Sequence, residues 1–289
     1  MCFIKRSLLV FTIFALVSCG GGGGVTDTPN SSSTLANQAI STLHADLVIL
    51  DTVTDEQVSQ IIASVNQQLK ESGLSEDDNA TLVLPSLLEG VMEGIGTLAL
   101  KDAQLINSLI EQSISSVMGL LATKPPTTRQ LRRSNRSFTE LQSLLELLVD
   151  KAVSSLEKTK LPIESLGTGV GKVVHAMVAS LDKAQIENTE VSSAVDKVVG
   201  KSMQSLEKLP VVVWEGSVKH ITEQAISGTG NLVARVSGID LGESVGKVVN
   251  AVVTNLDKVQ TGSVDVNSQV EQVIRKGMES LGSRPKESK

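Results

Sequence analysis

The sequence predicts an all-α fold built from diverged helical-hairpin repeats, packed as a bundle or a short solenoid. The first observation is an internal duplication: residues 166–210 align without a gap onto residues 241–285, with 22 identities in 45 positions. The second is that apolar residues in both copies recur at the spacing of one helix face. Because one hairpin cannot bury such a face alone, we expect the copies to pack against each other or the rest of the chain.

Each copy of the duplicated unit predicts two amphipathic helices separated by a polar break. Proline ends the second helix of each copy, at Pro210 and at Pro285. In the first copy the two apolar stripes are Val170, Val173, Val174, Met177, Val178, Leu181 and Val191, Val195, Val198, Val199, Met203, Leu206. In the second copy they are Val245, Val248, Val249, Val252, Val253, Leu256 and Val266, Val270, Val273, Ile274, Met278, Leu281.

Glycine pairs spaced by four residues recur in three predicted helices. They are Gly90/Gly94, Gly167/Gly171 and Gly242/Gly246. This spacing places both glycines on one helix face, where the missing side chains allow another helix to approach closely. We therefore expect Gly171 and Gly246 to lie at close helix contacts, which would offset the low helix propensity of glycine.

The remaining segments divide the mature chain into two helical regions. Residues 34–123 form an N-terminal region, with helices predicted from Thr34 and Thr54 and a diverged hairpin after them. Residues 138–289 form a C-terminal region that contains the duplication. An additional helix is predicted between Pro210 and Ile239, broken at Gly228-Thr229-Gly230.

The first 19 residues have the pattern of an export signal. Two cations, Lys5 and Arg6, precede an apolar run too short to span a bilayer, and the run ends in Leu16-Val17-Ser18-Cys19. This tetrad resembles the lipobox of bacterial lipoproteins. The resemblance implies that residues 1–18 are a signal peptide and that Cys19 carries a thioether-linked diacylglycerol and an acylated amine. It also implies an outer-membrane destination, because Gly20 stands where an aspartate would favour the inner membrane.

The segment after Cys19 predicts a flexible tether. Residues 19–33 include five consecutive glycines and offer no apolar surface to bury. Several acyl chains on one residue give nearly irreversible anchoring, so the expected partner of this end is a membrane, reached through the lipid on Cys19.

A basic linker is predicted at residues 124–137, which contain five cations and no acid between Lys124 and Arg136. The simplest interpretation is a solvated connector. The alternative is electrostatic contact with anionic lipid headgroups or an acidic partner. The candidate residues for that contact are Arg129, Arg132, Arg133 and Arg136.

Composition argues against several functional classes. Aromatic residues make up only 2% of the chain and the net charge is −6, so recognition of nucleic acid is not expected. No cofactor or metal site is expected either, because both cysteines lie within the first 19 residues and the three histidines are far apart. The phosphate-loop-like stretch Gly167 to Lys172 lacks the required spacing and the following Ser or Thr.

These observations predict a lipid-anchored, non-enzymatic protein of the bacterial envelope with a structural or protein-interaction role. The protein partner is not identified by the sequence, and self-association is left open. One alternative is a membrane-active protein that inserts amphipathic hairpins, which an exposed apolar stripe would favour. The other is a carrier of an apolar ligand, which an apolar cavity between hairpins would favour.

Overall fold

The computed structural model describes residues 80–97, 102–120, 138–184, 186–256 and 266–282. Every regular element in these ranges is helical, which confirms the predicted all-α class. The α-helices are α4 (Ala80–Thr97), α5 (Ala103–Leu120), α6 (Phe138–Ser154), α7 (Ile163–Ala179), α8 (Val191–Ser205), α9 (Trp214–Arg235), α10 (Leu241–Leu256) and α11 (Val266–Gly282). The 3₁₀ turns are η1 (Leu156–Thr159), η2 (Leu181–Ala184), η3 (Leu206–Lys208) and η4 (Val211–Val213).

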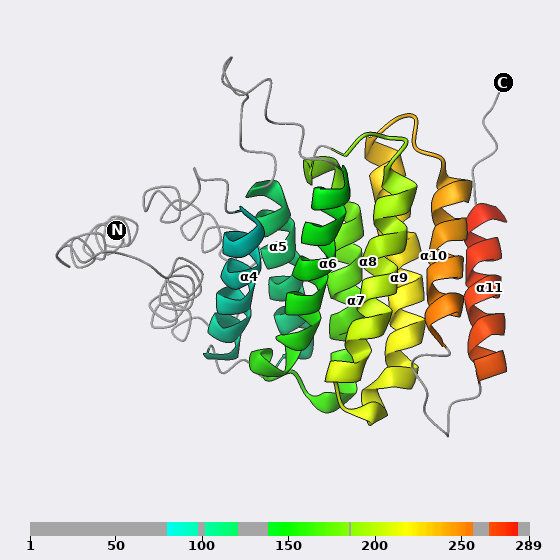
Figure 1. Cartoon of the computed structure of the whole chain (residues 1–289). Coiled ribbons are helices and arrows are strands. Elements are labelled where there is room, and N and C mark those ends of the chain that lie inside the picture. The colour runs from blue at the N-terminus through cyan, green and yellow to red at the C-terminus, as the bar shows by residue number, and fades with distance from the viewer. Residues whose placement is uncertain (1–79, 98–101, 121–137, 185, 257–265, 283–289) are drawn as a thin grey trace, which may run out of the picture.

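The helices stack in two layers, and successive helices alternate between them (Figure 1). Helices α4, α6, α8 and α10 follow one another in the first layer, and α5, α7, α9 and α11 in the second. The arrangement is a short solenoid in which each helix packs mainly on its neighbours along the stack.

Same-layer neighbours run parallel and in register. Along α6 and α8, Gln142 Nε2 donates to Ser193 Oγ at 2.9 Å and Lys197 Nζ lies 3.3 Å from Glu146 Oε1. Both pairs join residues that are 51 positions apart in the sequence. A constant separation is expected when two helices run parallel without a shift along their axes.

One continuous apolar core lies between the layers and includes residues from α4 to α11. The two stripes of the first duplicated copy are fully buried, which confirms their predicted orientation. In the second copy the stripe of α10 is buried or half-buried, whereas Ile274 and Met278 of α11 are exposed.

Corresponding helices of the two duplicated units lie in opposite layers. The first copy comprises α7 and α8, and the second comprises α10 and α11. Helix α9 stands between the copies, so one repeat interval spans three helices while the layers alternate every helix. Helix α7 therefore lies in the layer opposite to that of its counterpart α10.

The predicted break in the additional helix is wrong, because α9 continues from Trp214 to Arg235. Gly228 is buried against α7, and a Cβ there would lie 3.0 Å from the carbonyl oxygen of His175 and 3.2 Å from Val178 Cβ. The Thr229 hydroxyl donates to the Ala225 carbonyl oxygen at 2.8 Å. Close packing against α7 stabilises the helix across residues of low helix propensity, and the Thr229 hydroxyl has its hydrogen-bond partner within the helix.

The predicted glycine contact is confirmed at Gly171 and wrong at Gly246. A Cβ on Gly171 would lie 3.0 Å from His220 Cβ and 3.1 Å from Gln224 Cγ, so α7 and α9 approach too closely there for a larger residue. A Cβ on Gly246 would meet nothing within 4 Å. The reason is positional: α9 lies beside α7, but no helix of the described ranges occupies the equivalent place beside α10.

The export signal, the tether, the helices predicted from Thr34 and Thr54, and the basic linker all lie outside the described residues. Among the helices that are described, none combines the length and the hydropathy needed to cross a membrane.

Candidate functional site

The residues predicted to act at a membrane are not placed by the structure. Cys19 and the four arginines Arg129, Arg132, Arg133 and Arg136 lie outside the described ranges. Their roles stay predictions. The candidate sites below come from the helical stack.

Glu111 of α5 joins two basic groups of α7 at one point between the second-layer helices. His175 Nδ1 donates to Glu111 Oε1, and Lys172 Nζ donates to Glu111 Oε2 at 2.9 Å. The hydrogen bond with His175 is the main cause that lowers the pKa of Glu111, burial opposes it, and Lys172 lowers it further, to about 2. The carboxylate is therefore ionised across the whole physiological range.

His175 bridges three helices. Its Nε2 atom lies 3.0 Å from Asn231 Nδ2 of α9, and its side chain is only 15% exposed. The ring therefore joins α5, α7 and α9. No group of three His, Cys, Asp or Glu side chains that could hold a metal ion occurs in the described part of the chain.

The ion pairs between helices all have the same order of acid and base along the chain. In each, the acid belongs to the earlier helix or turn and the base to the later one. The pairs are Glu89–Lys151, Glu93–Lys158, Glu111–Lys172, Glu146–Lys197, Asp150–Lys201, Asp182–Arg235 and Glu223–Lys276. Partly exposed pairs contribute little stability individually, but this order favours one sequence of neighbours over its reverse.

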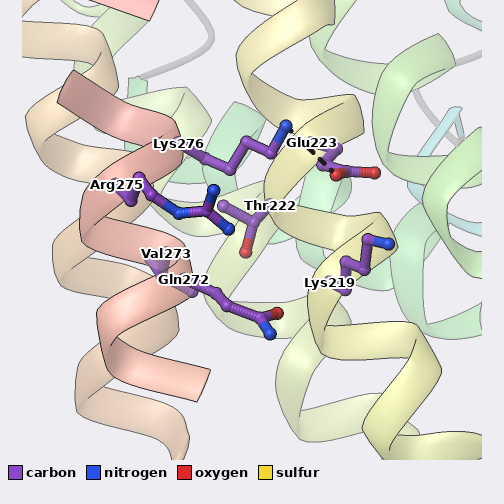
Figure 2. Close-up of a pocket in the computed structure, with 7 residues that line it drawn as sticks. All are labelled: Lys219, Thr222, Glu223, Gln272, Val273, Arg275 and Lys276. Atoms are coloured by element: carbon purple, nitrogen blue, oxygen red, sulfur yellow. Dashed lines mark ion pairs between the residues drawn. The ribbon is translucent and has the colours of Figure 1, made fainter. Parts of the chain in front are cut away.

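A small pocket lies between α9 and α11, with a volume of about 190 Å³ (Figure 2). Its lining residues are Lys219, Thr222, Glu223, Gln272, Val273, Arg275 and Lys276. Lys276 Nζ lies 3.6 Å from Glu223 Oε1, and the Thr222 hydroxyl donates to its own helix at the Val218 carbonyl oxygen. The pocket is smaller than typical ligand sites of roughly 300 Å³ or more, and the polar groups facing it are largely paired.

The last two helices display an apolar surface at the end of the described stack. We call it the terminal face and define it by Gly242, Gly246, Val249 and Val253 of α10 with Ile274 and Met278 of α11. Ile274 is 44% exposed and Met278 is 68% exposed. The sequence pattern placed Ile274 and Met278 in a buried stripe, so this exposure is a finding of the structure.

Equivalent positions in the first duplicated copy are all buried. The counterparts of the α10 residues are Gly167, Gly171, Val174 and Val178, and those of the α11 residues are Val199 and Met203. Val199 and Met203 have no exposed surface. Helix α7 is covered there by α9, and α8 by α10. The terminal face therefore repeats the surface that receives the next two helices inside the stack.

Comparison with known proteins assigns no family. No family model matches the sequence, and no curated protein matches it. Among solved structures, one described as "Computational Design of Self-Assembling Cyclic Protein Homooligomers" has a TM-score of 0.37 at 11% identity, covering 88% of this chain and 95% of that one. Likeness at this level supports no conclusion about fold family, assembly or activity.

Proposed function

We propose that the protein is a lipid-anchored envelope protein, attached to the outer membrane through Cys19, with a non-enzymatic structural or protein-interaction role. The observation that carries this proposal is the segment before the helices: an apolar export signal ending in Leu-Val-Ser-Cys, followed directly by five glycines. Such a tether would hold a folded body away from the lipid surface.

The helical stack supports the interaction role. Stacked helices present long continuous surfaces, which solenoid proteins use for binding other proteins. Here the partly exposed ion pairs line the layers, and the terminal face exposes apolar side chains of α11. Large exposed apolar side chains that lie next to one another are typical of interaction sites.

The two alternatives receive less support. Insertion of amphipathic hairpins into a membrane would be favoured by exposed apolar stripes. Ile274 and Met278 of α11 are exposed, but the stripes of α7 and α8 are fully buried in the stack. A carrier of an apolar ligand would need an apolar cavity, whereas the pocket between α9 and α11 is lined mainly by charged and polar side chains.

Replacement of Cys19 tests the anchor. We expect Cys19→Ala to move the protein from the membrane fraction to the soluble fraction and to abolish labelling by a fatty-acid analogue, because the acceptor thiol is lost. Cys2→Ala is the matched control, since Cys2 would be removed with the signal peptide, and it should leave both measurements unchanged. Membrane attachment that persists in Cys19→Ala contradicts the proposal.

A further inference from the structure

We infer that the terminal face is a homodimer interface, at which two copies of this chain join end to end about a two-fold axis. The inference names a partner for the interaction role proposed above, although it does not require the lipid anchor. It starts from the repeat: the surface that α9 and α10 cover in the first copy is present on α10 and α11 without a helix of the described ranges to cover it.

The α10 part of this face is complementary to itself. When two α10 helices are laid antiparallel, a single register places Val253 opposite Gly242 of the second copy and Val249 opposite Gly246. Each valine of one copy then lies opposite a glycine of the other copy, and the same holds for the valines of the second copy. An isologous interface requires this reciprocity.

The stack itself contains the same kind of contact. In the interior, Val178 of α7 packs on Gly228 of α9, so closely that a Cβ on the glycine would lie 3.2 Å from Val178 Cβ. Val178 is the residue that corresponds to Val253 in the duplication. Val253 in the terminal face is therefore placed to contact a glycine of another helix in the way its counterpart does.

The same axis passes close to Ile274 on α11. Helices α10 and α11 are neighbours joined through residues 257–265, and the chain reverses direction between them. Val248 lies eight residues before Leu256, and Ile274 lies eight residues after Val266, so the two residues are at similar heights. An axis centred between Lys247 and Val248 thus brings Ile274 near its symmetry mate.

The interface is small, and we expect a weak dimer. Helix α10 has 16 residues. At 1.5 Å per residue and about 20 Å across two helices, the face covers roughly 480 Å² per copy, which is below the roughly 800 Å² per partner of a standard interface and in the range of weak, transient contacts. If both copies are anchored in one membrane, as proposed above, their effective concentration rises without any new contact.

Disulfide trapping in the full-length chain tests the inference. We expect Ile274→Cys, oxidised mildly in whole cells before fractionation, to give a covalent dimer at least about tenfold more abundant than Val212→Cys, because a disulfide requires closely placed Cα atoms. Val212 is the matched control: it is 75% exposed, more than Ile274, but lies on η4 outside the terminal face. The unsubstituted chain reports any disulfide formed through Cys19.

A second substitution separates the interface from the fold. Adding Gly246→Leu to Ile274→Cys should abolish the dimer without lowering the melting temperature, because a Cβ at Gly246 meets nothing within 4 Å in its own copy and leucine favours the helix. Three outcomes overturn the inference: equal dimer from Val212→Cys, trapping that Gly246→Leu does not reduce, or capture of a different protein at Ile274. Membrane fractionation of the same samples reports separately on the anchor.

Discussion

Glu111 is the residue on which contacts among three second-layer helices converge. Its two carboxylate oxygens accept hydrogen bonds from His175 and Lys172, and His175 in turn contacts Asn231. A half-buried carboxylate with two such donors is stabilised in its charged form. Local sequence patterns could not predict this cluster, because Glu111 and His175 are separated by 64 residues.

Acid should remove the stabilisation that Glu111 provides. Its folded-state pKa is about 2, below the ordinary value of 4.5. A lowered folded-state pKa stabilises the protein fully above the unfolded-state value, and this stabilisation is lost as the pH falls from about 4.5 to 2. Between pH 4.5 and pH 2, we expect the free energy of unfolding of Glu111→Gln to fall by about 2 kcal/mol less than that of the parent chain. Urea unfolding at several pH values measures this difference.

The exposed carboxylate Glu164 supplies the control for this measurement. Glu164→Gln should keep the acid dependence of the parent chain. If Glu111→Gln loses as much stability between pH 4.5 and pH 2 as the parent chain does, the ionised cluster does not stabilise the fold.

At the scale of the element, α9 illustrates what local sequence signals cannot decide. Gly228-Thr229-Gly230 has the composition of a turn, yet α9 passes through it because Gly228 packs on α7. Gly230 lies in the same helix with nothing within 4 Å of its Cβ position. Two glycines that look alike in sequence thus have different roles.

Substitutions at these two glycines should shift stability in opposite directions. Gly230→Ala should raise the free energy of unfolding by about 0.5–1 kcal/mol, because alanine favours the helix and meets no neighbour. Gly228→Leu should lower it by at least about 1–3 kcal/mol, because the side chain would force α7 and α9 apart. Thermal and urea unfolding of both variants measure this. Destabilisation by Gly230→Ala would indicate that α9 is broken there after all.

The sequence predicted the elements better than their arrangement. Apolar periodicity and the prolines located the helices of the duplicated unit, because these signals are local. The layer that each copy's helices occupy depends on how many helices lie between the copies. The glycines of α9 made it look like a broken helix, so this number could not be counted from the sequence. The packed role of Gly171 and the open position of Gly246 could not be told apart, since the sequence is the same and only the neighbour differs.

For the whole molecule, stability should decrease toward the end of the stack. Helices α7 and α8 have same-layer neighbours on both sides, whereas α10 and α11 have a described neighbour on one side only. In a stack of this kind, each helix is stabilised mainly by its neighbours. Hydrogen exchange at low protein concentration should therefore find slower exchange in α7 and α8 than in α10 and α11. Equal protection of α8 and α11 would mean that the stack opens as one unit.

An odd number of helices per repeat constrains how such a protein can lengthen. Because α7 and its counterpart α10 lie in opposite layers, a gene duplication that adds one unit of this kind moves every later helix to the other side of the molecule. Each unit must therefore tolerate both environments, and only an even number of added units restores the original arrangement. Selection on such a repeat would favour helices whose sequences can pack equally well in either layer.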